Sequence, residues 1–353
     1  MTSPTGNTET ATHSRIGRQG RFAEAATIAE RPLQIYQKSL GPDHPDVVRG
    51  LLLLAIIHQE RAEFDEASLL FHRALDIRRK TYGSDNIIIA SSYADLARLA
   101  IAQRHFDKAA QYATDVLSLH EKNFGADDPR VLPALITVSL LSVLTGQADT
   151  AEALLRRALS ISERTFGADS VPVANVLSGL ADVYGVRGKY GDAEELYERP
   201  LAIYRKALGP KHPMVAASLD RLARLYIALG RAKSAESVYD EAEAILVESL
   251  GQNSPALSGI YNNKALLLLQ LNRTSDAELL FKRAAELLMS GAGKETPALA
   301  IVLSNLGNLY EATGRRKEAV KARQQSATIF RKIYGDTRVP VAPAAILPTW
   351  QEL

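Results

Sequence analysis

Residues 209–250 read GPKHPMVAASLDRLARLYIALGRAKSAESVYDEAEAILVESL, and this unit of 42 residues recurs along the chain without an insertion or deletion. Two positions mark the period. Glycine recurs at Gly41, Gly83, Gly125, Gly167, Gly209, Gly251, Gly293 and Gly335, and alanine at Ala25, Ala67, Ala109, Ala151, Ala193, Ala235, Ala277 and Ala319. A fixed period of this length predicts a stack of one supersecondary unit, in which each repeat buries its apolar face against its neighbours.

Each unit predicts two helices. A helix-capping residue such as Thr296 follows the glycine loop, and proline stands next to it at Pro297, as expected for the first position of a helix. Aliphatic residues then recur at helical spacing around a small residue, Ala223 in this unit. Gly230 suits the left-handed residue that ends the first helix. The other residues in the capping register are Asn86, Asp128, Ser170 and Ser254, with His44 and His212 in the same place.

The order of small residue, turn, alanine, aromatic and alanine resembles the tetratricopeptide repeat. It is seen as Ala223, Gly230, Ala235, Tyr239 and Ala242, and again as Ala265, Asn272, Ala277, Phe281 and Ala284. The length of 42 residues and the linkers Leu40–Pro45 and Leu208–Pro213 are similar to those of kinesin light chains and nephrocystin-3-like proteins. The resemblance implies an all-α, right-handed superhelical solenoid of antiparallel helix hairpins, with the first helices on its concave face.

The repeat pattern also divides the chain. We expect a disordered tail over residues 1–15, a solenoid over 16–335 with seven full repeats after an N-terminal half repeat, and a Pro-rich tail or cap over 336–353. Pro340, Pro343 and Pro348 interrupt what would be the next first helix. This C-terminal segment either caps the last hairpin or folds back into the groove, and the chain is either complete or a fragment of a larger protein.

A longer segment of sequence recurs at a distance of four repeats. Residues 30–45 read ERPLQIYQKSLGPDHP and residues 198–213 read ERPLAIYRKALGPKHP, which match at twelve of sixteen positions. We interpret this as duplication of a larger block. Pro32 and Pro200 fall inside a predicted second helix and should kink it, either as a tolerated bend or as a hinge.

The composition excludes several kinds of chemistry. The chain has no cysteine, and its seven histidines show no metal-binding spacing. Residues 291–296, GAGKET, lack the first glycine and the final Ser or Thr of a phosphate-binding loop. We therefore expect no enzyme activity, cofactor or metal site.

The net charge of +2 gives no electrostatic footprint for nucleic acid, and the longest apolar run, Leu51–Ile57, is too short to cross a membrane. No secretory signal is recognisable in the first residues. We therefore expect a soluble, cytoplasmic protein that binds neither nucleic acid nor membrane.

Helical phase predicts a polar inner wall in the last three repeats. Kinesin light chains carry Asn-Asn pairs in the same register, which implies contact with peptide cargo, and Asn262–Asn263 keeps that pair. Two alternatives stay open, namely recognition of an acidic motif or terminal carboxylate and an ordinary solvated helix face. The candidate peptide-binding residues are Asp220, Arg221, Arg224, Asn262, Asn263, Ser304, Asn305 and Asn308.

The inner positions of the first and third repeats are apolar instead. They predict a groove for an apolar peptide or helix, unless neighbouring repeats or superhelical closure bury them. These residues are Leu52, Leu53, Ile56, Ile136, Leu140 and Val143.

The function favoured by the sequence is a protein-interaction scaffold that binds a peptide or protein segment along the concave face. A self-assembling structural solenoid and a regulatory fragment of a larger multidomain protein are the alternatives. The sequence identifies neither the partner nor the oligomeric state.

Overall fold

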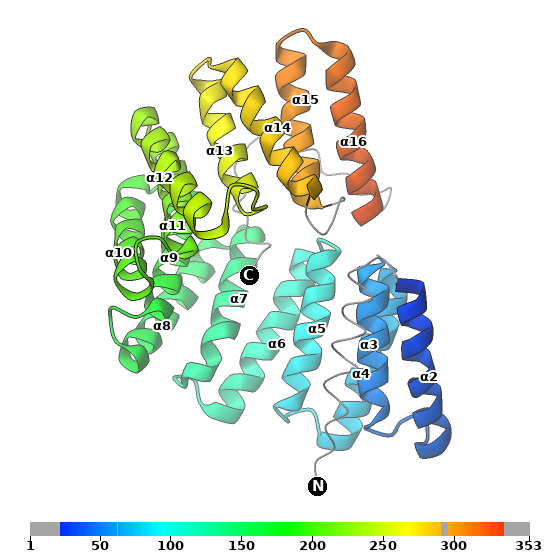
Figure 1. Ribbon diagram of the computed structural model, residues 1–353. Coiled ribbons are helices and arrows are strands. Elements are labelled where there is room, and N and C mark those ends of the chain that lie inside the picture. Colours follow the sequence, from blue (N-terminus) through cyan, green and yellow to red (C-terminus); the bar gives the residue numbers. More distant parts are fainter. Residues whose placement is uncertain (1–21, 62, 291–295, 335–353) are drawn as a thin grey trace. The chain divides into compact units, whose positions relative to one another are not determined.

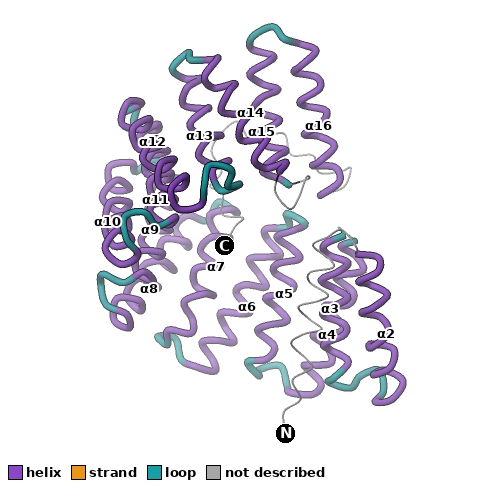
Figure 2. Tube along the Cα trace, viewed as in Figure 1, coloured by secondary structure: helices purple, strands orange, loops and turns teal. Residues whose placement is uncertain are grey.

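The structure is a computed structural model that describes residues 22–61, 63–290 and 296–334. The expected N-terminal tail, the C-terminal tail or cap, and the glycines Gly293 and Gly335 lie outside these residues. The described part is helical and contains no strand (Figures 1 and 2). The helices are α2 (Phe22–Leu40), α3 (Val47–Glu60), α4 (Phe64–Tyr82), α5 (Ile88–Ala102), α6 (Phe106–Phe124), the 3-10 helix η1 (Pro129–Val131), α7 (Leu132–Leu144), α8 (Ala148–Phe166), α9 (Val171–Val186), α10 (Tyr190–Leu208), α11 (Pro213–Ala228), α12 (Ala232–Leu250), α13 (Leu257–Gln270), α14 (Thr274–Ser290), α15 (Pro297–Ala312) and α16 (Arg316–Tyr334).

The chain divides into two compact units, Met1–Ile161 and Ser162–Leu353, and the boundary falls within α8. In each unit consecutive helices pack on one another. The first helix of a repeat, such as α11, contacts its own second helix α12 and the second helix α10 of the preceding repeat. This alternation is the packing of a tetratricopeptide-like solenoid, so the predicted all-α repeat fold is confirmed.

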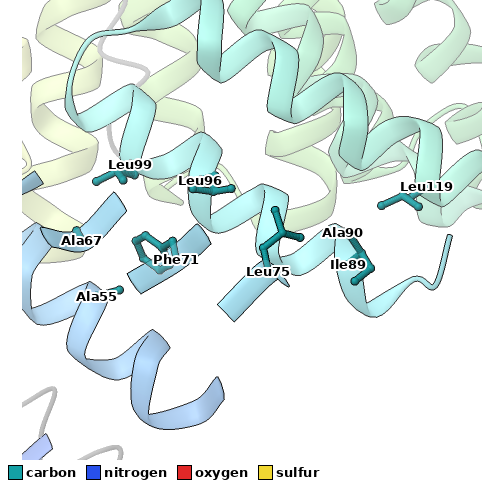
Figure 3. Close-up of a cluster of buried hydrophobic side chains, with 9 residues drawn as sticks. All are labelled: Ala55, Ala67, Phe71, Leu75, Ile89, Ala90, Leu96, Leu99 and Leu119. Carbon is teal, nitrogen blue, oxygen red and sulfur yellow. The ribbon is translucent and has the colours of Figure 1, made fainter. Parts of the chain in front are cut away.

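The alanine register is the tightest point of this packing. Ala67, Ala109, Ala151, Ala193, Ala235, Ala277 and Ala319 are all fully buried. The small residue of the first helix is equally restricted, because a Cβ atom on Gly307 would lie 2.8 Å from Arg323 Cγ. One core cluster of the first unit shows the result: Phe71 of α4 lies between Ala55 of α3 and Leu96 of α5 (Figure 3).

Most of the predicted capping residues accept hydrogen bonds from the backbone at the start of the first helices, whereas the Ser170 side chain makes no such bond to α9. Asp128 Oδ1 accepts from Arg130 N at 2.9 Å, and Thr296 Oγ1 accepts from Leu299 N at 3.2 Å. The regular helix begins two residues later than expected in α3 and α13, and one residue later in α5. The reason is a tighter first turn, in which Val47 N donates to His44 O at 2.9 Å.

Most first helices end on a residue with left-handed backbone, as predicted. Gly146, Gly188, Gly230 and Gly314 have φ between 70° and 78°. Arg104 and Asn272 hold the same register with φ of 59°, although they carry a Cβ that disfavours this conformation.

Ion pairs join successive repeats at a constant sequence spacing. Arg231 Nη1 lies 2.7 Å from Glu194 Oε1, and Arg315 Nη1 lies 2.7 Å from Glu278 Oε2. Each pair is partly exposed and contributes little by itself. The helices α2 and α10 continue through Pro32 and Pro200 without interruption.

Candidate peptide-binding face

The first helices of the second unit carry the candidate peptide-binding residues. They are α9, α11, α13 and α15, which we call the first-helix layer. Asp220, Arg221 and Arg224 lie on α11, Asn262 and Asn263 on α13, and Ser304, Asn305 and Asn308 on α15. The constant period of the sequence places equivalent side chains of neighbouring first helices side by side.

Three hydrogen bonds join the amides and one carboxylate into a continuous line. Asn305 Nδ2 donates to Asn262 Oδ1 at 2.9 Å, and Asn262 Nδ2 donates to Asn263 Oδ1 at 3.1 Å. Asn263 Nδ2 then donates to Asp220 Oδ1 at 2.8 Å. The line crosses from α15 through α13 to α11. Each bond between helices joins residues that are separated by one repeat and one position.

An ion-pair cluster continues this line towards α9. Arg224 Nε lies 3.4 Å from Asp220 Oδ2, and Arg221 Nε lies 3.6 Å from Asp182 Oδ2. The Tyr197 hydroxyl of α10 donates a hydrogen bond to Asp182 Oδ1. The side chains of the four charged residues are only 10–16% exposed. The cluster is therefore a largely buried network rather than a solvated helix face, and its two positive and two negative charges balance.

Burial governs the protonation of this cluster. Desolvation raises the pKa of Asp182 above its usual value, and the nearby Arg221 and Arg224 oppose that rise. Burial also raises the pKa of Tyr197, which the charge of Asp182 reinforces. Desolvation would lower the pKa of Arg224, but Asp220 and Asp182 more than offset it and the pKa is raised. Arg224 therefore stays charged, whereas burial disfavours the ionised form of Asp182.

Three buried polar atoms of this region make no hydrogen bond within the described residues. They are Tyr239 Oη of α12, Arg224 Nε and Asp182 Oδ2. Tyr239 is fully buried, and both its burial and the charge of Asp220 raise its pKa. Arg224 Nε and Asp182 Oδ2 each face an opposite charge, so the cost of an unmade hydrogen bond, about 1–3 kcal/mol, falls on the Tyr239 hydroxyl. The hydrogen bonding of the network is therefore incomplete at Tyr239.

The remaining predicted residues lie at the margin of the network. Ser304 is half-buried, and Asn308 is exposed and accepts a hydrogen bond from Arg323 Nη2 at 3.2 Å. Asp182, Tyr197 and Tyr239 are not among the candidate residues predicted from the sequence. Asp182 had a usable signal, because it stands one repeat before Arg224 and shares its register. The two tyrosines had none beyond their aromatic packing positions.

The apolar candidates of the first unit do not form one uninterrupted surface. Leu52 and Leu53 are half-buried and pack against the core clusters of α3 and α4. Ile56 and Ile136 are 40% and 38% exposed. Leu140 and Val143 are half-buried on α7. Between α3 and α7 in the chain, α5 carries an ion pair of Asp95 and Arg98, which separates the two apolar regions along the stack of first helices.

No group of three or more His, Cys, Asp or Glu side chains that could hold a metal ion is found among the described residues. None of the helices in the described ranges is long and apolar enough to cross a membrane.

Family models identify the repeat. Four matches to a tetratricopeptide repeat model cover residues 16–80, 51–122, 134–206 and 172–247, and a second tetratricopeptide repeat model matches residues 299–338. The matches span more than half of the chain, so the protein belongs to the tetratricopeptide repeat family. No curated protein sequence matches it.

Solved structures of similar fold include kinesin-light-chain-like proteins. BtubC (BKLC) from P. vanneervenii is 23% identical, with a TM-score of 0.51 over 69% of this chain and 96% of its own. A putative kinesin light chain from Podosopora anserina, with nearly identical TPR-like repeats, is 25% identical, with a TM-score of 0.47 over 58% of this chain and 97% of its own. A Rap protein complexed with Competence and Sporulation Factor is 12% identical, with a TM-score of 0.55 over 94% and 99%.

Proposed function

We propose that this protein is an interaction scaffold that binds an extended peptide along the first-helix layer of its second unit. The observation that carries the proposal is the line of Asn305, Asn262, Asn263 and Asp220, which crosses three successive first helices. Tetratricopeptide repeats are typically protein-interaction modules, which supports binding rather than catalysis. The partner is a peptide or protein segment whose sequence is still to be found.

The side-chain chemistry favours recognition of a peptide backbone. A carboxamide offers both a donor and an acceptor, as a peptide bond does. The three asparagines use only part of this capacity in the contacts that join them. Their spacing by one repeat places such groups at regular intervals along the layer. An extended segment would therefore meet a matching group on each first helix that it crosses.

The ion-pair cluster gives less support to an acidic motif as ligand. Arg221 and Arg224 already face Asp182 and Asp220, so the cluster has no net positive charge. A carboxylate on the ligand would compete with two carboxylates that are fixed in the protein. The cluster is better suited to holding α9 and α11 in position, and so to fixing the geometry of the asparagine line.

A solved structure of similar fold supports binding at the level of the fold alone. The Rap protein of similar fold was crystallised in complex with Competence and Sporulation Factor. At 12% identity this likeness concerns the fold alone. The contact to a ligand in this protein rests on the asparagine line.

The test is selection of binding peptides from a random displayed library against the full chain, followed by affinity measurement with labelled selected peptides. The Asn263→Ala, Asn305→Ala double variant should weaken binding roughly thirtyfold, because two hydrogen bonds of about 1 kcal/mol each are lost. The matched control is Gln324→Ala, Gln325→Ala, which removes two exposed carboxamides from α16. Equal affinity of the double variant and the control would remove the asparagine line from the binding site.

The apolar positions of the first unit are a second candidate surface. The exposed fractions of Ile56 and Ile136 favour it, whereas the ion pair on α5 breaks its continuity. The same selected peptides distinguish the two surfaces: an Ile56→Ser, Ile136→Ser variant should leave their affinity unchanged if the second unit holds the site.

A further inference from the structure

Two helices of this protein that share the duplicated block differ sharply in burial. The helices α2 and α10 lie four repeats apart in the chain, and both carry the Ile-Tyr pair of the duplicated block. On α10, Ile203 and Tyr204 are 4% and 0% exposed. On α2, Ile35 and Tyr36 are 57% and 43% exposed. The same Ile-Tyr pair is therefore an exposed apolar surface on α2 and part of the buried core on α10.

The exposure of Ile35 is exceptional for its register. Every other described second helix has an aliphatic residue at this position, and each is at most 7% exposed. These residues are Ile77, Leu119, Ile161, Ile203, Ile245, Leu287 and Ile329. A position that is buried in seven repeats and exposed in one indicates a site whose partner is absent among the described residues.

The duplicate shows what kind of partner fits. In the second unit α9 packs along α10, and the Tyr204 hydroxyl donates to Asn175 Oδ1 at 2.5 Å. Asn175 stands in the first turns of α9, where the buried residues are Val173, Ala174, Val176 and Leu177. The face of Ile35 and Tyr36 therefore fits a segment whose apolar residues are as small and branched as those at the start of α9.

One segment of this chain repeats that chemistry. Residues 339–342 read VPVA, as do residues 171–174 at the start of α9, and the two segments lie four repeats apart. The buried positions of α9 correspond to Val341, Ala342, Ala344 and Ala345. Pro340 stands where α9 has Pro172, but Pro343 replaces Asn175, and Pro343 and Pro348 both disfavour a regular helix. The match to α9 therefore lies in its apolar side chains and not in the hydrogen bond of Asn175. Residues 339–347 lie outside the described part of the structure.

Residues near the N-terminus fit this face less well. Four repeats before α9, the same buried positions are Thr5, Gly6, Thr8 and Glu9. Three of these are polar and the fourth is glycine, so this stretch has no apolar stripe to place on Ile35.

We propose that residues 339–347 of a second copy dock on the Ile35–Tyr36 face of α2, so that copies associate head to tail. The sequence register supports a second copy. The helix α16 lies four repeats after α8, and α2 lies four repeats before α10. The order α16, residues 339–347 and the next copy's α2 therefore repeats the internal order α8, α9 and α10. This inference goes beyond peptide binding and uses a different surface.

The first test is the mass of the full chain in solution, measured by sedimentation velocity across a range of concentrations. The wild type should grow in mass with concentration. Ile35→Glu should weaken association at least about tenfold, because it places a charge in an apolar contact. The matched control is Leu69→Glu on α4, since Leu69 is also an exposed aliphatic residue of the first unit, and it should associate as the wild type does.

A mixing experiment tests the pairing itself. A chain with Ile35→Glu keeps its C-terminal segment, and a chain lacking residues 339–353 keeps its α2 face. Each alone should be monomeric, and their mixture should give a one-to-one dimer that does not grow further. Val341→Asp should also prevent association, and it leaves every described helix unchanged.

Three results would overturn the proposal. A wild type that stays monomeric at all concentrations excludes a second copy, including the case in which the segment docks within its own chain. Association that survives Val341→Asp but not Ile35→Glu assigns the face to another occupant. An equal loss of association in Leu69→Glu and Ile35→Glu, with helicity retained by circular dichroism, would show that added surface charge causes the loss and not a change in the α2 face.

Discussion

One register of the first helices holds apolar and charged residues, and their burial differs between the two units. In the first unit this register holds Ile56, which is 40% exposed. In the second unit it holds Asp182 and Arg224, whose side chains are only 10% and 14% exposed. The charged residues are thus more buried than the isoleucine. Hydrophobicity alone does not decide burial on this layer, because available partners and neighbouring side chains decide it.

The ion pair that the arginine of this register makes also differs between the two units. On α5 of the first unit, Asp95 and Arg98 pair within one helix, and Arg98 remains 64% exposed. On α11 of the second unit, Arg224 lies between Asp220 and the more distant Asp182. When one partner of an exposed ion pair is lost, water solvates the charge that remains. When one partner of a buried cluster is lost, the remaining charge is left uncompensated.

The largest expected effect follows from this contrast. Arg224→Ala should destabilise the second unit by about 3–5 kcal/mol, because it leaves Asp220 and Asp182 with less compensation in a buried site. Arg98→Ala, in the same register of the first unit, should cost no more than about 1 kcal/mol. Urea unfolding followed by circular dichroism measures both. Similar losses in the two variants would contradict the difference between the units.

Core packing should not distinguish the units. Ala67→Leu in the first unit and Ala235→Leu in the second should each cost about 1–3 kcal/mol, because both alanines are fully buried between helices. Ala244→Leu on the exposed side of α12 is the control and should be nearly neutral. Thermal unfolding of the three variants gives the comparison. A large difference between Ala67→Leu and Ala235→Leu would show that the repeats are packed unequally.

The turn register offers a stabilising change. Arg104→Gly should raise stability by about 1 kcal/mol, because arginine at a φ of 59° carries a strain that glycine avoids. Asn272→Gly should gain less, since asparagine tolerates this conformation better. Unfolding midpoints in urea rank the two variants. A loss of stability in Arg104→Gly would mean that its side-chain contacts outweigh the backbone strain.

The pKa values of two aspartates should be shifted in opposite directions. Hydrogen bonds from Arg130 lower the pKa of Asp128 in the first unit to about 2, whereas burial raises that of Asp182 in the second. Carboxyl carbon chemical shifts followed by NMR across acidic pH measure both. A titration of Asp182 below that of Asp128 would contradict the burial of the cluster.

The same shifts predict opposite and small effects on stability. The contribution of Asp128 is present above its unfolded pKa of 3.8 and is lost as the pH falls towards 2. The contribution of Asp182 is present below 3.8 and is lost as the pH rises through its raised folded pKa. Asp182→Asn should therefore gain on the wild type as the pH rises, and Asp128→Asn should gain as the pH falls. Unfolding curves over this pH range check the two signs.

The repeat, its turns and its capping register could be predicted from the sequence because each depends on residues close together in the chain. Thr296 caps α15 through a neighbour three residues away, and Gly230 ends α11 by its own backbone angle. The buried alanines were also predictable, since the period fixes where one hairpin crosses itself. The later start of α3 was not, because it depends on how a single turn closes.

The candidate site was predicted only in outline. The sequence placed Asn262, Asn263 and Asn305 on one face, and the structure joins them. It did not indicate that Asp182 and Tyr197 belong with Arg221, because those partners are distant in the chain and lie on other helices. Peptide binding at this face remains a prediction.

The sequence by itself determined the unit, its length and its internal order, because a hairpin is built from local propensities and a fixed apolar period. Only the tertiary structure decided which identical residues are buried. Ile35 and Ile203 stand in the same sequence context, yet Ile35 lies exposed on α2 and Ile203 is buried on α10, which packs on α9. The physical reason is that burial belongs to a contact between two elements, and the sequence of one element does not contain its partner.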